Sequence, residues 1–388
     1  MSEWKKVKLG ELYEVHNGLS KGRQFFGSGY PFLTFSTVFN NWFLPEILDS
    51  LVQSSDKERE ACSIKRGDVF ITRTSETMDE LGMSSVALKD YPNATYNGFT
   101  KRLRPTTDDV IPEYIGYYLR SKKFRGKFMA FSSMTTRASL ANDDLLSMEV
   151  EIPEKSTQQH IATILSRYDS LIENYQKQIK LLEEAAQRLY KEWFVDLHFP
   201  GHEHTKIVNG VPEGWEKKKL VEIAELKAGG DKPKIVSAKR TNECSVPIFS
   251  NGTTNEGLYG YTNFPVILEQ SVTISARGSV GYTVFRRTPF VPIVRLISVT
   301  PHNIYVGYIF YCLKSTTLDS NGAAQQQITI PMIRNKEITI PSKGILELFE
   351  SQTEPIFNQI DILKEQIRLL TEARDRLLPK LMSGEIAV

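Results

Sequence analysis

The feature that most constrains the fold of this 388-residue chain is an internal repeat. Three segments of the first half recur in the same order in the second: WKKVKLGEL at 4–12 as WEKKKLVEI at 215–223, YIGY at 114–117 as YVGY at 305–308, and Ile179–Leu189 as Ile367–Leu377. Matches that keep their order indicate duplication of a whole unit, rather than chance likeness between two amphipathic helices. We therefore expect two related domains, each followed by a helix.

Two long segments are predicted to be helices with an apolar seam. Between Ser156 and Asp196 the sequence has no Pro or Gly, and apolar residues recur in steps of four and three, as in a heptad pattern. The second helix repeats the pattern, with Thr353 and Arg374 at imperfect positions. The seam residues are Leu165, Ile172, Ile179, Leu182 and Leu189 in the first helix, and Ile360, Ile367, Leu370 and Leu377 in the second.

A helix of about 40 residues spans roughly 60 Å, which one small domain cannot cover. The two helices could pair with each other in antiparallel fashion, or each could pair with a second chain. Two matched seams within one chain favour the intramolecular pairing. The predicted fold class is therefore α+β: two mixed α/β domains joined by two long helices that form an intramolecular antiparallel coiled coil, with an internal pseudo-two-fold repeat.

The predicted boundaries follow from the repeat and from breaks in the helical pattern. They are a first domain at 1–153, a central long helix at 154–197, a hinge linker at 198–214, a second domain at 215–341 and a C-terminal long helix at 342–388. The linker is rich in Gly and Pro, which end a helix. Its His198, His202 and His204 could suggest a metal site, but their spacing without Cys favours a surface loop, and we expect no metal.

Charge is distributed unevenly along the chain. The net charge is only +2, yet residues 205–341 contain 16 Lys and Arg against 10 Asp and Glu. In the first domain, residues 101–140 contain nine basic and three acidic residues. Basic stripes of this kind suit a polyanion such as DNA.

Candidate DNA contacts lie on polar loops, several of which follow predicted strands at 68–72 and 271–275. Arg can bond guanine with two hydrogen bonds, Asn and Gln can do the same with adenine, and Ser, Thr and main-chain amides suit phosphates. The predicted DNA-binding residues are Lys21, Arg23, Gln24, Arg73, Thr74, Ser75, Lys101, Arg102, Arg137, Lys232, Lys234, Arg240, Asn251, Arg277, Ser279 and Gln326.

Common catalytic signatures do not occur in the sequence. There is no GxxxxGK[ST], HExxH, GxSxG or CxxC motif, and no [ND]PP[YFW] tetrapeptide of amino-methyltransferases. We therefore expect no catalytic residue and no enzyme activity of the chain itself. The sequence also lacks an apolar stretch of about 18 residues or a signal-peptide core, so a cytoplasmic location without membrane contact is expected.

The whole arrangement resembles the specificity subunit of type I restriction-modification systems. The resemblance rests on a domain opening Trp-x-x-x-x-Leu, a long helix ending in Trp193-Phe-Val-Asp196, the hinge from Phe199-Pro-Gly201 to Trp215, and a second such domain and helix. It covers essentially the whole chain. The segment Arg277-Gly-Ser-Val-Gly281 also matches, whereas the first domain has Arg73-Thr-Ser-Glu76 instead.

The resemblance implies two target-recognition domains that read the two halves of a bipartite double-stranded DNA sequence. It also implies that the helices set the gap between the halves and dock two methyltransferase subunits, which two restriction (motor-nuclease) subunits would join. ATP, Mg²⁺ and S-adenosylmethionine would then bind to partner subunits in a bacterium or archaeon, and no cofactor to this chain. The alternatives are a coiled-coil interaction scaffold without DNA specificity, or a self-contained methyltransferase or nuclease, which the missing motifs disfavour.

Overall fold

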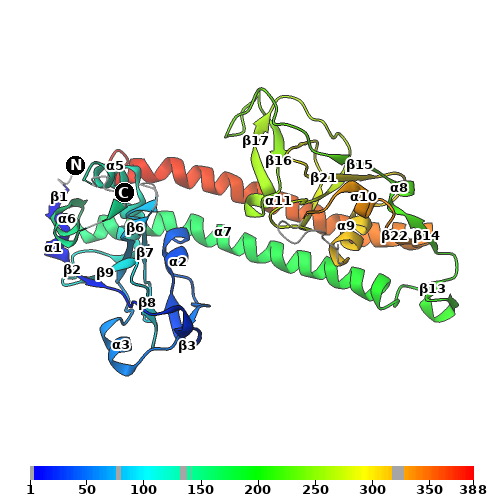
Figure 1. Ribbon diagram of the computed structural model, residues 1–388. Coiled ribbons are helices and arrows are strands. Elements are labelled where there is room, and N and C mark those ends of the chain that lie inside the picture. Colours follow the sequence, from blue (N-terminus) through cyan, green and yellow to red (C-terminus); the bar gives the residue numbers. More distant parts are fainter. Residues whose placement is uncertain (1–3, 76–79, 132–137, 140, 317–326) are drawn as a thin grey trace. The chain divides into compact units, whose positions relative to one another are not determined.

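A computed structural model describes residues 4–75, 80–131, 138–139, 141–316 and 327–388. The chain divides into two compact units (Figure 1): unit 1 is Met1–Tyr175 with Glu365–Val388, and unit 2 is Gln176–Lys364. The long helices α7 (Lys155–Tyr190) and α11 (Lys343–Ser383) cross this division, so each unit contains one part of each helix. The predicted boundaries of the two globular domains stay a prediction.

Unit 1 is built around a four-stranded antiparallel sheet with the strand order β2-β9-β5-β7. Its strands are β2 (Tyr13–Asn17), β9 (Thr100–Pro105), β5 (Val69–Thr72) and β7 (Ser84–Val86). The smaller pairings are β4 (Leu51–Val52), β3 (Phe26–Leu33) and β8 (Thr95–Tyr96) in one sheet, β1 (Lys5–Lys8) with β11 (Glu149–Ile152), and β6 (Thr74–Ser75) with β10 (Ala138–Ser139). The helices are α1 (Leu9–Leu12), α2 (Phe35–Asn40), α3 (Asp56–Ala61), α4 (Pro112–Arg120), α5 (Lys122–Phe131) and α6 (Asn142–Ser147).

Unit 2 repeats this plan with a sheet of order β15-β21-β18-β19. The strands are β15 (Ala224–Ala228), β21 (Ile297–Pro301), β18 (Ser271–Ile274) and β19 (Thr283–Arg286). The smaller pairings are β17 (Leu258–Thr262), β16 (Val246–Phe249) and β20 (Val291–Pro292) in one sheet, β14 (Glu216–Lys219) with β22 (Glu337–Ile340), and β12 (Ile207–Val208) with β13 (Val211–Pro212). The helices are α8 (Leu220–Ile223), α9 (Val306–Ser315) and α10 (Ile330–Ile333).

Strand register confirms the repeat and corrects one of its alignments. The pair β1–β11 sets Lys5 opposite Ile152, and β14–β22 sets Glu216 opposite Ile340. The Tyr114 hydroxyl of α4 donates to the Glu151 carbonyl, and the Tyr308 hydroxyl of α9 donates to the equivalent Thr339 carbonyl. Tyr308 therefore takes the place of Tyr114. The sequence match of YIGY with YVGY, which paired Tyr308 with Tyr117, is wrong by one helical turn.

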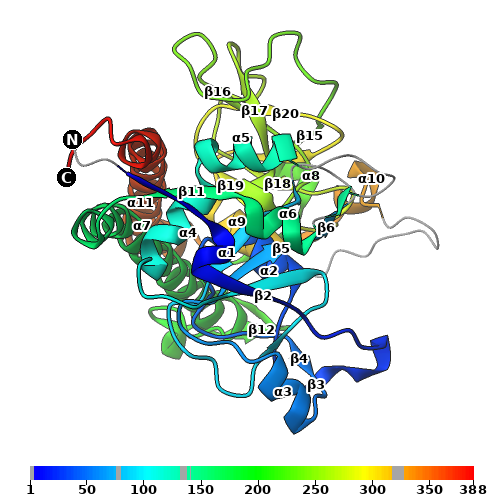
Figure 2. The same cartoon turned by 90° about the vertical axis from the view of Figure 1, so that its left-hand side faces the viewer.

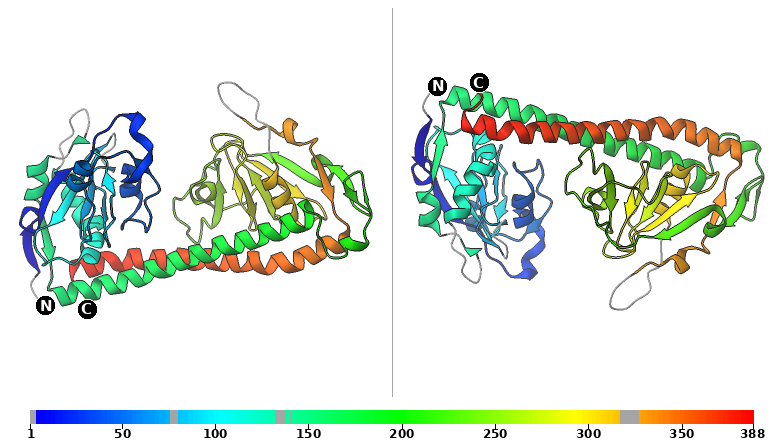
Figure 3. Two further views of the ribbon diagram at one scale, coloured as in Figure 1. Left: turned by 90° about the horizontal axis from the view of Figure 1, so that it is seen from below. Right: turned by 90° about the horizontal axis from the view of Figure 1, so that it is seen from above.

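The two long helices pack against each other within each unit, as Figures 2 and 3 show. In unit 1, Ile161 and Leu165 of α7 share a buried core with Leu381 of α11. In unit 2, Tyr190 near the end of α7 contacts Phe349 near the start of α11, with ring centroids 6.4 Å apart. Early residues of one helix thus meet late residues of the other, so the predicted antiparallel intramolecular pairing is confirmed. None of the helices in the described part of the chain has the length and apolarity that a membrane crossing requires.

The predicted seam residues differ in how deeply they are buried. Leu165 and Ile360 are buried. The others are half-buried: Ile172, Ile179, Leu182, Leu189, Ile367, Leu370 and Leu377. A half-buried seam is typical of two paired helices that no third layer covers.

The two imperfect seam positions are satisfied by polar partners. The buried Thr353 hydroxyl donates to the Phe349 carbonyl at 2.8 Å and lies 3.0 Å from the Tyr305 hydroxyl. The Arg374 guanidinium lies 2.6 Å from the Asp169 carboxylate of α7. Each polar residue therefore keeps a hydrogen bond inside the packed layer, which removes most of the cost of its burial.

Candidate nucleic-acid interface

A cavity of about 480 Å³ on unit 2 gathers three cationic side chains. Its lining comprises Gly229, Gly230, Asp231, Lys232, Tyr259, Arg277, Ile293, Val294 and Arg295. Lys232, Arg277 and Arg295 are exposed, and the Tyr259 side chain is 49% exposed. Only Asp231 supplies negative charge among the lining residues, so the groove suits a polyanion. We call these nine residues the cationic groove.

One side of the groove is a backbone turn in an uncommon conformation. Val294 and Arg295 have φ angles of +53° and +61°, although neither is glycine. This left-handed conformation costs about 1–3 kcal/mol per non-glycine residue and needs support from its surroundings. The Val294 amide donates to the Gly230 carbonyl at 2.9 Å, and the Arg295 amide donates to the Gly229 carbonyl at 2.8 Å. These bonds hold the Arg295 side chain at the groove.

The Asn251 side chain stabilises the same turn through two hydrogen bonds. Its amide nitrogen donates to the Val294 carbonyl at 2.6 Å, and its side-chain oxygen accepts from the Ala276 amide at 2.7 Å. Because both ends of the side-chain amide are used, Asn251 joins the Val294–Arg295 turn to the loop that carries Arg277. Asn251 was predicted to contact DNA, but its amide is already bonded to the protein on both sides.

The loop that bears Arg277 and Ser279 is a tight turn after β18. The Gly281 amide donates to the Ser275 carbonyl at 2.9 Å, and Gly278 and Gly281 have φ angles of +68° and +83°. Arg277 Nε donates to the Gln327 side chain at 3.2 Å, and Ser279 is exposed. The turn therefore presents the Arg-Gly-Ser-Val-Gly segment to solvent.

The other described residues predicted in unit 2 do not line the groove. Lys234 and Arg240 are exposed on the segment that follows Lys232. Gln326 lies outside the described residues. Of the predicted residues in this unit, the structure thus brings Lys232 and Arg277 together.

In unit 1, one of the predicted DNA-binding residues at 21–24, Lys21, is already bonded within the protein. Lys21 Nζ lies 2.8 Å from the Glu58 carboxylate and donates to the Gln53 carbonyl at 2.7 Å. The hydrogen bond from Lys21 lowers the pKa of the Glu58 carboxyl to about 2. Arg23 and Gln24 are exposed in a short 3₁₀ helix, Arg23–Phe25. Arg23 and Gln24 are therefore open to solvent, whereas Lys21 is engaged.

The predicted segment after β5 is only partly described. Arg73 is half-buried and donates to the Asn17 side chain at 3.2 Å. Thr74 and Ser75 form β6, whose backbone pairs with β10, but nothing is described of their side chains. Arg137 lies outside the described residues.

Lys101 and Arg102 are placed in the interior of unit 1, not on its surface. Their exposed fractions are 4% and 2%. Lys101 bonds the Asn142 side chain, and burial lowers the pKa of its ammonium group. Arg102 donates to the Ser63 carbonyl at 2.7 Å. The two residues are consecutive in the central strand β9 and so point to opposite faces of the sheet, and both faces are covered at this place. We leave both residues out of the proposed interface.

Sequence reasoning missed Arg295 and Tyr259. Arg295 is an isolated basic residue in an apolar stretch. Its position at the groove depends on the left-handed turn at Val294 and Arg295, which no sequence motif predicts. Tyr259 follows from strand alternation only once β17 is known. Within the described part of the chain, no group of three His, Cys, Asp or Glu side chains is arranged to hold a metal ion.

Comparison with known proteins places this geometry in context. The sequence matches the type I restriction modification DNA specificity domain over residues 1–184 and 212–374. It is 28% identical to the MjaIX type I restriction enzyme specificity subunit of Methanocaldococcus jannaschii, over 100% of this chain and 94% of the relative. It is 24% identical to the HindI specificity subunit of Haemophilus influenzae, over 100% of both.

Among solved structures, the S subunit of a type I restriction-modification system from M. genitalium has a similar fold. The TM-score is 0.60 at 17% sequence identity, with 98% of this chain and 96% of the other covered. Such identity supports a shared fold alone.

Proposed function

The chain belongs to the type I restriction-modification DNA specificity family, and we propose that it reads a bipartite DNA target, one half by each globular domain. Its role in such a system is DNA specificity and not catalysis. The observation that supports reading by unit 2 is the cationic groove, where Arg277 and Arg295 lie beside exposed Tyr259. Arginine side chains of this kind bond guanine in the major groove, and lysine contacts phosphates.

In this proposal the first domain reads the 5′ half and the second domain the 3′ half. The joined helices α7 and α11 set the number of unread base pairs between the halves. Joining two readers makes the second binding event effectively intramolecular, so a rare, long target is bound more tightly than either half alone. Outer faces of the same helices dock two methyltransferase subunits, and restriction subunits join that assembly.

The catalytic cofactors belong to the partners in this proposal. ATP, Mg²⁺ and S-adenosylmethionine would be bound by the methyltransferase and restriction subunits. The chain would work in the cytoplasm of a bacterium or archaeon, where the DNA that it reads is located.

Methylome sequencing tests the proposal. Cells would express the full chain with its methyltransferase subunit, or a chimera whose residues 1–153 come from a related specificity subunit. We expect a bipartite methylation motif whose 5′ half alone changes in the chimera. If no bipartite motif appears when all components are expressed, the proposal fails and a scaffold role gains support.

A second variant addresses the spacer. Inserting one helical turn into both α7 and α11 should change the spacer length and leave both half-sites intact. An unchanged spacer would overturn the assignment of the helices as the element that sets it.

A further inference from the structure

The outer edge of the main sheet is closed in unit 1 and open in unit 2. In unit 1 the edge strand is β7, and residues 42–44 lie alongside it. The Val86 amide donates to the Trp42 carbonyl at 3.1 Å, and the Leu44 amide donates to the Val86 carbonyl at 2.9 Å. The chain thus covers its own sheet edge, which would otherwise present unpaired backbone groups.

Side chains complete the closure in unit 1. The Trp42 ring lies 5.7 Å from the Tyr117 ring, and the Arg120 guanidinium lies 5.8 Å from the Trp42 ring. Arg120 also donates to the carbonyls of Val38, Phe39 and Asn41, at the end of α2, and to the Ser84 carbonyl of β7. The α2 segment, its tryptophan and Arg120 therefore form one packed arrangement.

The equivalent edge of unit 2 is β19. In unit 1 the Thr72 amide donates to the Met83 carbonyl, and in unit 2 the Ser275 amide donates to the Tyr282 carbonyl. These two bonds occupy the same place in the repeated sheet. Counting along the strands from them, Phe285 of β19 takes the place of Val86 of β7. The register points the Phe285 amide and carbonyl to the outer edge. Neither group makes a hydrogen bond along that edge to any residue that the structure describes.

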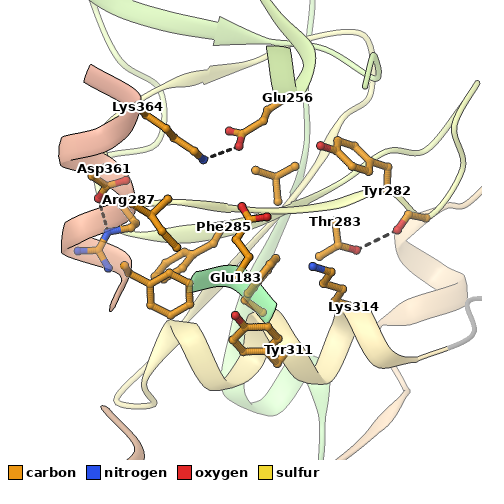
Figure 4. Close-up of a pocket in the computed structure, with 15 residues that line it drawn as sticks. Glu183, Glu256, Tyr282, Thr283, Phe285, Arg287, Tyr311, Lys314, Asp361 and Lys364 are labelled. Carbon is orange, nitrogen blue, oxygen red and sulfur yellow. Dashed lines mark hydrogen bonds and ion pairs between the residues drawn. The ribbon is translucent and has the colours of Figure 1, made fainter. Parts of the chain in front are cut away.

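A cavity of about 340 Å³ lies beside this open edge (Figure 4). Its floor is aromatic, with Phe310, Tyr311 and Phe357 almost fully buried. Glu183 of α7 and Lys314 of α9 line it and are both exposed. By the α4–α9 equivalence, Tyr311 takes the place of Tyr117 and Lys314 that of Arg120, so the cavity lies where unit 1 holds Trp42.

Two of the charged side chains that line this cavity are not paired with an opposite charge. Within the described residues, Glu183 and Lys314 make no hydrogen bond or ion pair; the Lys314 ammonium lies 5.3 Å from the Phe310 ring. Arg120, in the equivalent place, bonds backbone carbonyls. A lysine there can do the same for an added segment, while Glu183 can accept the indole N–H of a tryptophan.

We propose that the open edge of β19 and its adjoining cavity bind an extended segment of a partner subunit, which places a tryptophan side chain between Glu183 and Lys314. The segment adds beside β19 as residues 42–44 add beside β7, a mode in which main-chain bonds give affinity and a pocket gives selectivity. That the partner is another subunit of the restriction-modification complex rests on the proposed function.

A difference between the two units limits the size of the residue that follows the tryptophan in the bound segment. In unit 1, a Cβ on Gly116 would lie 2.4 Å from the Phe43 ring, so Phe43 fits only because position 116 is glycine. Phe310 stands at that position in unit 2 and fills the space itself. The bound segment therefore carries a small residue after its tryptophan.

A peptide copied from this chain tests the proposal. The probe is a fluorescent nonapeptide with the sequence of residues 38–46 and the change Phe43→Ala, titrated into the full-length protein by fluorescence anisotropy. We expect saturable binding, weakened at least tenfold when the peptide tryptophan is replaced by alanine, which removes the ring from the cavity. Absence of saturable binding up to about 1 mM peptide overturns the proposal.

Variants of the protein locate the binding site. Glu183→Trp should fill the cavity with its own indole and weaken peptide binding at least tenfold, and Lys314→Ala should weaken it several-fold. The matched control is Lys343→Ala, at an exposed lysine of the same unit outside the cavity. Equal binding by wild type, Glu183→Trp and Lys314→Ala would show that the peptide binds elsewhere and would overturn the proposal.

The same proteins are assayed for DNA binding and for thermal unfolding. Unchanged values in the Lys314→Ala variant make lost peptide binding specific to this edge. If the wild type does not bind DNA, the proposed function is contradicted while the peptide result stands. A failure of the proposed function can therefore be told apart from a failure of the peptide-binding proposal.

Discussion

The two units use their basic residues in different ways. In unit 1, Lys21 pairs with Glu58, the buried Arg102 bonds the Ser63 carbonyl, and Arg104 lies 2.7 Å from the buried Asp68 carboxylate. In unit 2, Lys232 and Arg295 stand exposed around a groove. The repeated scaffold therefore does not carry its charges in repeated places. A basic residue count over a segment predicts a DNA-binding face only where loops, and not central strands, carry the charge.

The largest expected effect is a difference in the free energy of unfolding between alanine variants at Arg120 and at its equivalent, Lys314. Arg120→Ala should lower the free energy of unfolding by about 3 kcal/mol, because several backbone carbonyls lose a charged donor. Lys314→Ala should change it by less than about 0.5 kcal/mol, because an exposed lysine that makes no hydrogen bond or ion pair contributes little. Urea unfolding of both variants measures the difference, and equal losses would contradict the closed and open descriptions of the two sheet edges.

Arg295 should matter for DNA reading more than any exposed lysine near it. Arg295→Ala in the assembled methyltransferase complex should weaken specific DNA binding by about 1–3 kcal/mol, the range of one two-bond arginine contact with a base. Lys234→Ala, outside the groove, serves as the control and should weaken binding less and equally for all sequences. Anisotropy titrations on target and scrambled DNA decide between them; the same loss for both variants would remove Arg295 from the reading surface.

Relief of the left-handed turn should stabilise the protein and impair reading. Val294→Gly should raise the free energy of unfolding by up to about 1 kcal/mol, because glycine adopts positive φ without strain. It should also weaken specific DNA binding several-fold, since Arg295 is then held less firmly. If Val294→Gly is destabilising, the Val294 side chain supplies packing that outweighs the strain.

The smallest effect concerns the Lys21–Glu58 pair. The pKa of the Glu58 carboxyl is lowered from 4.5 to about 2, so its contribution to stability is present above the unfolded pKa and is lost as the pH falls toward 2. The wild type should therefore lose slightly more stability than Glu58→Gln between pH of about 5 and 2. If urea unfolding shows the same pH dependence for the wild type and for Glu58→Gln, the Lys21–Glu58 pair does not contribute to stability.

Patterns with a long period could be predicted, and features set by tertiary contacts could not. The seam from Leu165 to Leu189 and the repeated Trp-x-x-x-x-Leu openings identified the helices and the duplication. The one-turn error at Tyr308 arose because YIGY and YVGY match by letters, whereas the Glu151 and Thr339 carbonyls set the true alignment. Arg102 looked like a surface cation because its burial depends on the partners that its strand acquires in the sheet.

The division of the chain also bears on the order in which the protein folds during synthesis. The unit 1 core includes Leu378, Leu381 and Met382, so it cannot be completed until these residues have left the ribosome. Unit 2 is continuous from Gln176 to Lys364 and is complete earlier. Domains usually fold in the order of synthesis, from the N-terminus onward. Here the second unit can close first, while the N-terminal unit waits for the C-terminal end of α11.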